Sequence, residues 1–413
     1  MQREYTNDSV REGRGGKQRG ALCGPDAADR YAAADIVQHV APTGFLDLGP
    51  GYLDPELVTT DTIGRAYSAA LARYGDTALA YGHNQGALPY RAALARHLTR
   101  TDSEPWMPSH LLTTSGTSQA LDMLASVFSR PDDVVLAEAP TYDLALNIFR
   151  DHGLTVSAVR CDADGPDPEE IERTVEAVRA SGRRVAFAYL IPTFHNPTAR
   201  LVPTARRTAL IAAAHRRNLL IVEDDAYTDL SLDGTPTPPS LTALAKWEGV
   251  LRLGTFSKTL APGMRLGWLG GSPHLCRRLA DRGVAHSGGS PSHLTSLAVA
   301  QLMDDGGYVE HLEQLRARLA QRREALSVTL REHLPDDFTL RPVHGGLFVW
   351  VGIPPWLPEQ EAVGRASAAG VLVQPGSRFG SREPAVRLAY SAHPPTRLRS
   401  AAARLAGAWR QKG

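Results

Sequence analysis

Short apolar runs alternate with longer amphipathic segments through the middle of the chain. Each run is nearly continuous in apolar residues and is bounded by glycine, proline or charged residues, which is typical of a strand buried on both faces of a sheet. The predicted strands are residues 111–114, 134–138, 185–191, 220–224, 249–254 and 266–270. The alternation of strand and helix between residues 110 and 290 predicts an α/β fold, with a largely parallel sheet and helices on both faces.

The flanking regions predict a second, smaller α/β domain. Before the first predicted strand, a helix that belongs to the large domain is expected where five apolar residues follow helical spacing: Ile63, Tyr67, Ala70, Leu71 and Tyr74. One long helix over residues 292–334 is expected to join the two domains. The expected elements after it are strands at 338–341 and 345–351, a helix at 358–369, and strands from 371 and at 386–390. We assign residues 61–290 to the large domain, 26–60 and 291–413 to the small domain, and the polar residues 1–25 to a flexible tail.

Composition narrows the class of protein. The hydrophobic content of 43% and the charged content of 22% are ordinary for a globular protein. A net charge of +1 argues against nucleic acid or a membrane surface as the main partner. The three cysteines are widely spaced and form no metal-binding or disulfide pattern, and the N-terminus has no apolar signal segment. We therefore expect a cytoplasmic protein.

The strongest chemical signal is the turn at residues 255–267, which follows one predicted strand and precedes the next. Lys258 is one of only four lysines among the 45 basic residues, so arginine has replaced lysine almost everywhere else. Arginine cannot lose its proton and cannot form an imine, whereas a buried lysine can. With Arg265 seven residues later, the turn suits a lysine that bonds an aldehyde cofactor and an arginine that binds a phosphate.

Two other stretches predict contact with a ligand. Gly116 is followed by Thr117 and Ser118 at the start of a predicted helix, where hydroxyls and free backbone N–H groups either cap the helix or bind a phosphate; beside the lysine motif we favour phosphate. The Gly-Pro-Gly run at 49–51 lets backbone pass close to a ligand, or forms a plain loop.

The motif S/T-x-S-K-x-x-x-P-G-x-R-x-G at residues 255–267 resembles that of fold-type I aminotransferases, which use pyridoxal 5′-phosphate (PLP). The most similar branch contains 2-aminoadipate and kynurenine aminotransferases and the MocR-like regulators, and the resemblance spans about residues 40–410. It implies the PLP-dependent transferase fold of the aspartate aminotransferase type. No metal is expected.

The resemblance also implies roles for individual residues. Lys258 would bond PLP and then act as the base at the substrate α-carbon. Asp224 would pair with the pyridine nitrogen, a role that the D-x-A-Y spacing to Tyr227 gives to it rather than to Glu223 or Asp225. The other cofactor contacts implied are Tyr227 and Asn196 at the 3-oxygen, Tyr142 on the ring, and Thr117, Ser118, Thr255, Ser257 and Arg265 at the phosphate. The substrate contacts implied are Arg387, which would clamp the α-carboxylate, Asn196, Gly51 and His195.

Tyr81 and two departures from the family pattern need separate mention. By the resemblance, Tyr81 reaches the phosphate of a partner subunit in a homodimer, whereas the sequence alone indicates a partly buried loop tyrosine. His195 stands where this branch usually has glutamine, and either acts on substrate or is structural. Ala199 stands where the family has glycine, which we interpret as a tolerated turn variant.

These features predict a PLP-dependent aminotransferase that acts on an L-amino acid, with a 2-oxo acid as amino acceptor. The alternative is a biosynthetic PLP enzyme that diverts the quinonoid intermediate to decarboxylation-coupled oxidative deamination, or to β- or γ-elimination or replacement. A MocR-type regulator is not expected, because the stretch before the resemblance carries no helix–turn–helix pattern.

Overall fold

The structure is a computed structural model that describes residues 42–102 and 104–410. The described residues from 44 onward form one compact unit. The predicted tail at 1–25, and the part of the predicted small domain at 26–41, lie outside the described residues.

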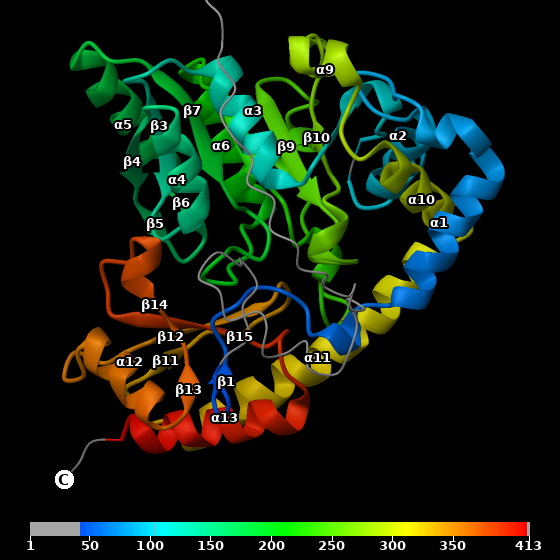
Figure 1. The fold of residues 1–413 in the computed structure, drawn as a ribbon. Coiled ribbons are helices and arrows are strands. Elements are labelled where there is room, and N and C mark those ends of the chain that lie inside the picture. The colour runs from blue at the N-terminus through cyan, green and yellow to red at the C-terminus, as the bar shows by residue number, and fades with distance from the viewer. Residues whose placement is uncertain (1–41, 103, 411–413) are drawn as a thin grey trace, which may run out of the picture. The chain divides into compact units, whose positions relative to one another are not determined.

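A seven-stranded sheet occupies the upper part of the view in Figure 1. In spatial order its strands are β2 (Leu111–Thr114), β10 (Gly267–Gly270), β9 (Val250–Thr255), β8 (Ile221–Asp224), β7 (Val185–Leu190), β3 (Val134–Glu138) and β4 (Thr155–Val159). Only β10 runs antiparallel to its neighbours. The predicted α/β fold is confirmed. The sequence pattern did not predict β4, because this edge strand is largely unburied and its apolar run is weak.

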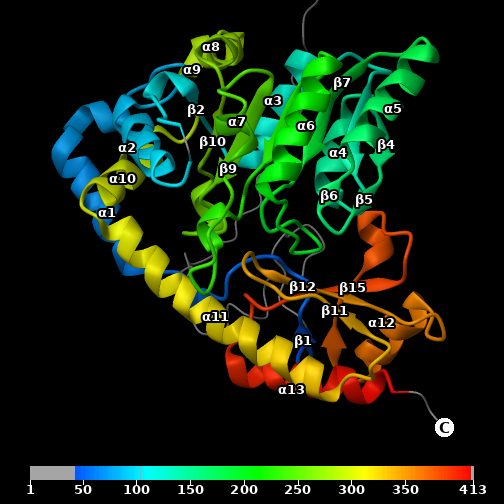
Figure 2. The same cartoon turned by 180° about the vertical axis from the view of Figure 1, so that it is seen from behind.

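Helices cover both faces of the main sheet, as Figures 1 and 2 show from opposite sides. One face packs against α3 (Thr117–Phe128), α4 (Asp143–Asp151) and α8 (Pro273–Ala280). The other packs against α5 (Pro168–Ala180), α6 (Thr204–Arg216) and α7 (Leu241–Leu244). Because successive side chains of a strand point to opposite faces, both sets must be apolar, which explains the continuous runs.

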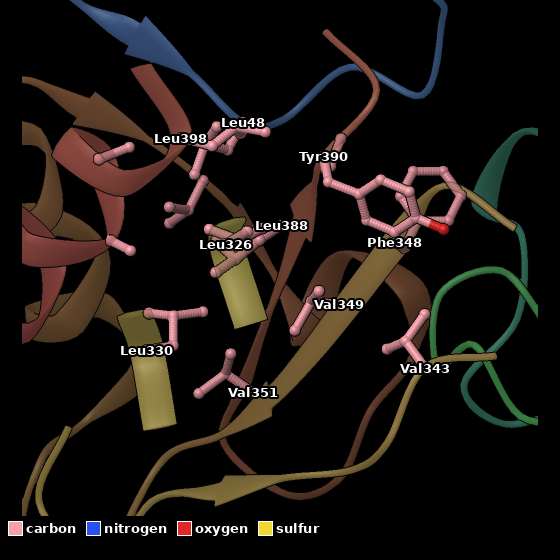
Figure 3. Packing of buried hydrophobic residues seen from close by; sticks show 14 of the residues in the cluster. Leu48, Leu326, Leu330, Val343, Phe348, Val349, Val351, Leu388, Tyr390 and Leu398 are labelled. Atoms are coloured by element: carbon pink, nitrogen blue, oxygen red, sulfur yellow. The ribbon is translucent and has the colours of Figure 1, made fainter. Parts of the chain in front are cut away.

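The C-terminal part contains a second, antiparallel sheet in the order β11 (Thr339–Leu340), β12 (Phe348–Gly352), β15 (Ala385–Ala389), β14 (Gln374–Pro375). Beside it, β1 (Leu46–Asp47) pairs with β13 (Val371–Leu372). The helices here are α11 (Gly307–His333), α12 (Glu359–Ala368) and α13 (Pro395–Ala408). Figure 3 shows Leu326 and Leu330 of α11 and Leu398 of α13 facing Val349 and Leu388 of the sheet. A short hairpin, β5 (Cys161–Asp162) with β6 (Gly165–Pro166), extends the region after β4.

The long helix predicted over residues 292–334 is wrong as a single element. It divides into α10 (His293–Asp304) and α11, because Gly306 adopts φ +83° and ends the first helix. α10 and the start of α11, with Tyr308 and Leu312, pack in one cluster with α1 (Thr60–Tyr74) and α2 (Leu88–Thr99). From Leu315 onward, α11 packs with the second sheet. The division into two domains stays a prediction. The predicted boundary at residue 291 lies before α10, whereas the packing changes within α11, between Leu312 and Leu315.

The helix predicted around Ile63 is α1, but Leu71 on its expected apolar face is 40% exposed. The remaining α-helix, α9 (Gly283–Gly288), is short, and several 3-10 helices lie in the connections. Within the described ranges, no helix combines the length and the apolar character that crossing a membrane requires.

Candidate active site

Lys258 lies in the turn after β9, and its Nζ donates a hydrogen bond to the carbonyl oxygen of Gly51 at 2.7 Å. The Gly-Pro-Gly segment therefore does pass beside the lysine. Burial lowers the pKa of Lys258 to about 8, helped by the positive charges of Arg387 and Arg265 and opposed by the charge of Asp224. With this pKa about a tenth of the Lys258 amines are neutral at pH 7, against well under a thousandth for an ordinary lysine, and the neutral form is the one that imine formation requires.

A ready-made anion site lies at the N-terminus of α3. Gly116 precedes the helix with φ +87°, and no side chain caps the helix. A Cβ added to Gly116 would stand 3.3 Å from Nη2 of Arg265 and 3.7 Å from Oγ1 of Thr255, so the guanidinium and the hydroxyl converge on the helix start. Thr255 donates to Oγ of Ser257 at 3.0 Å. Uncapped N–H groups, two hydroxyls and an arginine form the donor set that a phosphate needs.

Asp224 is the last residue of β8 and is buried. Its Oδ2 accepts a hydrogen bond from the hydroxyl of Tyr189 at 2.6 Å, whereas Oδ1 is buried and has no hydrogen-bond partner in the described structure. Burial raises the pKa of Asp224 to about 6, although the Tyr189 bond opposes the rise. A buried carboxylate oxygen without a partner is costly, and it fits a ligand N–H such as that of a protonated pyridine.

The two acidic neighbours of Asp224 are engaged elsewhere. Glu223 accepts hydrogen bonds from the backbone N–H groups of Leu241 and Thr242 at the start of α7, at 2.9 and 3.0 Å. Asp225 pairs with Arg252 at 2.6 Å. The choice of Asp224 over its neighbours, made above from spacing to Tyr227, agrees with this distribution of partners.

Arg387, in the middle of β15, reaches the same site. Its Nη1 donates to Oδ1 of Asn196 at 2.8 Å and its Nη2 to the carbonyl of Gly49 at 2.6 Å. Its guanidinium lies between two aromatic rings, 4.1 Å from the centroid of Phe348 and 4.6 Å from that of Phe379. Two of its five N–H groups are thereby used, and the buried Nε has no partner among the described residues. The three remaining N–H groups suffice to bind a carboxylate.

Tyr227 and Tyr142 complete the surroundings of Asp224. Tyr227 is buried near Asn196, whose side chain hydrogen-bonds it, and burial raises the pKa of the Tyr227 phenol. Tyr142 precedes α4, and burial together with the charge of Asp224 raises its pKa to about 12. PLP fits this arrangement in three places. Its pyridine ring matches the unpartnered oxygen of Asp224, its 3-oxygen matches the phenols, and its phosphate matches the anion site at Gly116.

His195 is fully buried, and its ring lies in a polar cluster. Its Nδ1 lies 2.8 Å from Oγ1 of Thr198, and its Nε2 lies 3.4 Å from the buried carboxylate of Glu138, which also binds Arg200. Burial holds the pKa of His195 well below its usual value, so the ring is neutral. These contacts favour the structural interpretation, and a substrate contact for His195 stays a prediction. Ala199 adopts φ +57° in this turn, which explains the family's glycine.

Tyr81 is 87% exposed, so the partly buried loop position indicated by the sequence is wrong. A side chain this exposed lies largely in solvent within a single copy of the chain, which leaves its phenol accessible to a second copy.

Sequence reasoning missed three residues of this site. Tyr189 lies within a predicted buried strand and was not singled out. The signal that could have identified it is its hydroxyl, on a strand face otherwise packed with apolar side chains. Phe348 lies on another strand, and only the pairing of β12 with β15 brings it beside Arg387, whereas Phe379 ends a short 3-10 helix just before β15.

Comparison with known proteins agrees with this geometry. The family model for aminotransferase class I and II matches residues 51–405. An aromatic-amino-acid aminotransferase of Thermococcus litoralis is 31% identical over 90% of this chain and 89% of its own length. YisV of Bacillus subtilis, an uncharacterised HTH-type transcriptional regulator, is 34% identical over 86% of this chain and 72% of its own length.

A solved structure extends the likeness to the cofactor. LysN, the α-aminoadipate aminotransferase of Thermus thermophilus, superimposes with a TM-score of 0.78 at 31% identity, over 89% of this chain and 92% of that one, and it was solved with N-(5′-phosphopyridoxyl)-L-leucine. The protein therefore belongs to the aminotransferase class I and II family and is a PLP-dependent aminotransferase.

Proposed function

We propose that this enzyme transfers the amino group of an L-amino acid to a 2-oxo acid, with the site around Lys258, Asp224 and Arg387 as its catalytic centre. The observation that carries the proposal is the convergence of a lysine of lowered pKa, a buried carboxylate with one free oxygen, and a buried arginine with spare N–H groups. PLP, when bound, supplies an electron sink for the negative charge that develops at the substrate α-carbon.

The chain's own residues would hold the cofactor at both ends. Arg265, Thr255, Ser257 and the start of α3, with Thr117 and Ser118, would bind the phosphate. Asp224 would keep the ring nitrogen protonated, Asn196 and Tyr227 would donate to the 3-oxygen, and Tyr142 would cover one face of the ring.

Lys258 and Arg387 would act on the substrate. Arg387 would bind the α-carboxylate through the N–H groups that Asn196 and Gly49 leave free, which fixes the substrate relative to the lysine. Lys258, as a neutral amine, would accept the α-proton at Nζ and deliver it to the cofactor carbon that carried the aldehyde. Gly51 would lie beside the substrate, since its carbonyl already contacts Nζ of Lys258.

We also propose a homodimer in which Tyr81 completes the partner's phosphate site. Support comes from the 87% exposure of Tyr81, and from Leu79, Leu88 and Val284, which are 72%, 54% and 86% exposed. Tyr81→Phe should weaken PLP binding about tenfold, as loss of a charged hydrogen bond does. Ultracentrifugation gives the oligomeric state, and wild-type cofactor affinity in the variant would count against the shared site.

A single-turnover experiment tests the function. The holoenzyme is mixed with each amino acid without an acceptor, and spectra and products are recorded. Stoichiometric conversion to the pyridoxamine form, with release of the matching 2-oxo acid, is expected for the true donor. Release of carbon dioxide, peroxide or a leaving group while the starting spectrum returns would overturn amino transfer in favour of the diverted reactions.

A ligand-sensing role is a second candidate, favoured by the 34% identity to the regulator YisV. It predicts that amino acids bind to the holoenzyme and shift its spectrum without release of an oxo acid. The same experiment therefore separates the two candidates, and a DNA-binding assay on the purified protein tests the regulator directly.

A further inference from the structure

The hydrogen bond between Tyr189 and Asp224 separates the two oxygens of the Asp224 carboxylate. The phenol donates to Oδ2 at 2.6 Å, and Oδ1 is left buried without a partner among the described residues. Tyr189 is 0% exposed and Asp224 is 5% exposed, so no solvent competes for this bond. The carboxylate is thus anchored on one side and open on the other.

The strand arrangement makes this contact a consequence of the fold. Tyr189 lies on β7 and Asp224 on the adjacent parallel strand β8, where Val222 is the partner of Tyr189 in the ladder. Val222 and Asp224 are two residues apart and therefore point to the same face as Tyr189. Phe149 of α4 packs edge-on against the Tyr189 ring at 5.5 Å, which fixes the direction of its hydroxyl.

We infer that Tyr189 is a positioning residue, whose hydroxyl fixes the rotation of the Asp224 carboxylate and favours its anionic form, so that Oδ1 alone receives the N–H of the cofactor ring. The inference rests on the proposed role of Asp224. It assigns a task to a residue outside the set that the family motif identified.

The charges around Asp224 explain why its anionic form needs the hydrogen bond from Tyr189. Asp225, next along the chain, and burial both disfavour the anion, whereas Lys258 and the Tyr189 bond favour it. The phenols of Tyr142 and Tyr227 also interact electrostatically with the carboxylate. Once Lys258 is bonded to the cofactor, its electrostatic effect on Asp224 changes. The hydroxyl of Tyr189 continues to donate its hydrogen bond to the Asp224 carboxylate.

The test is Tyr189→Phe, studied as holoenzyme loaded with ring-¹⁵N-labelled PLP. Without the donated bond, Asp224 becomes the stronger base and the shared proton moves toward it. We expect the ¹⁵N signal to shift toward that of unprotonated pyridine, and kcat to fall about tenfold with KM nearly unchanged, since Arg387 still binds substrate. A ¹⁵N signal and kcat identical to wild type would overturn the inference.

Tyr308→Phe is the matched control. Tyr308 is also buried and also donates to a carboxylate, that of Asp229 at 2.9 Å. It should lower thermal stability as Tyr189→Phe does but leave the ¹⁵N signal in place. An equal shift of the signal in both variants would assign the effect to general loosening and overturn the inference.

A double-mutant cycle separates this inference from the proposed role of Asp224. In an Asp224→Ala background, Tyr189→Phe should change the PLP dissociation constant less than about twofold, against several-fold in the wild type. Equal changes in both backgrounds would overturn the inference alone. If Asp224→Ala keeps a protonated ring nitrogen and full activity, the role of Asp224 itself fails.

Discussion

Replacing Arg387 by lysine tests the substrate clamp without removing the charge. The guanidinium binds Asn196 at 2.8 Å and the Gly49 carbonyl at 2.6 Å while it lies between the rings of Phe348 and Phe379. A lysine ammonium has three donors and no planar fork. It can satisfy these two oxygens or bind a carboxylate with two donors, but it cannot do both.

The expected loss follows from the bond that disappears. One charged hydrogen bond contributes about 2 kcal/mol, which corresponds to about a 30-fold loss in kcat/KM. Burial already lowers the pKa of Arg387 to about 10. In the Arg387→Lys variant the same burial acts on a lysine, whose ordinary pKa is about 10.4. Part of the positive charge of that lysine is therefore lost as the pH rises toward about 8, and the loss in kcat/KM should increase.

The assay compares an amino acid substrate with its carboxamide, which lacks the α-carboxylate. Arg387→Lys should lower kcat/KM for the amino acid about 30-fold and change that for the carboxamide by less than about threefold. Arg378→Lys is the control, because the side chain of Arg378, which pairs with Asp143 at 2.7 Å, is 47% exposed and such a pair contributes little. Equal losses on both substrates, or no loss on either, would refute the clamp.

Three further outcomes are expected. Apo-protein should recombine with PLP at a rate that rises with pH through a midpoint of about 8, because only neutral Lys258 attacks an aldehyde. The Lys258→Ala variant should show no such rise, and a midpoint near 10.5 in the wild type would contradict the lowered pKa of Lys258. Arg252→Met leaves two buried carboxylates without their cation, so urea denaturation should show a loss of about 3–5 kcal/mol in unfolding free energy. Gly51→Ala places a Cβ 2.6 Å from Cζ of Phe348 and should cost about 1–3 kcal/mol in the same assay, whereas Gly64→Ala, with open space around it, should not destabilise the protein.

The order of strands and helices could be predicted because both faces of the main sheet are covered. Each central strand of the main sheet is then a continuous apolar run. Among the strands of this sheet, only the exposed edge strand β4 was not predicted. The break at Gly306 was overlooked because apolar residues on both of its sides, such as Leu302 and Tyr308, face the same core, and an apolar pattern does not report whether the helix is continuous. The exposure of Tyr81 depends on surfaces that a local pattern does not encode.

The candidate site was predictable where chemistry and spacing coincide, as at Lys258 and Arg265. The contacts between these residues were not, since they depend on side-chain direction. Arg387 shows the difference. Its strand was predicted, but its contacts with Asn196 and Gly49 join positions 191 and 338 residues apart along the chain. The aromatic rings on either side follow from strand register, which spacing does not reveal.

The three consecutive acids at the end of β8 illustrate how the fold gives different tasks to adjacent residues. Alternation along the strand sends Glu223 to the face of α7, where backbone N–H groups bind it, and Asp224 to the opposite face, where Tyr189 lies. Asp225 leaves the sheet and meets Arg252, which reaches it from β9. Glu223 and Asp225 are thus engaged by N–H groups or a cation, whereas Asp224 is held by a neutral donor. An oxygen without a hydrogen-bond partner does not distinguish Asp224, since Oδ1 of Asp225 also has none among the described residues, but Asp225 has Arg252 as its cation. A carboxylate intended for a cationic ligand must lack a resident cation, and in this triplet only Asp224 meets that condition.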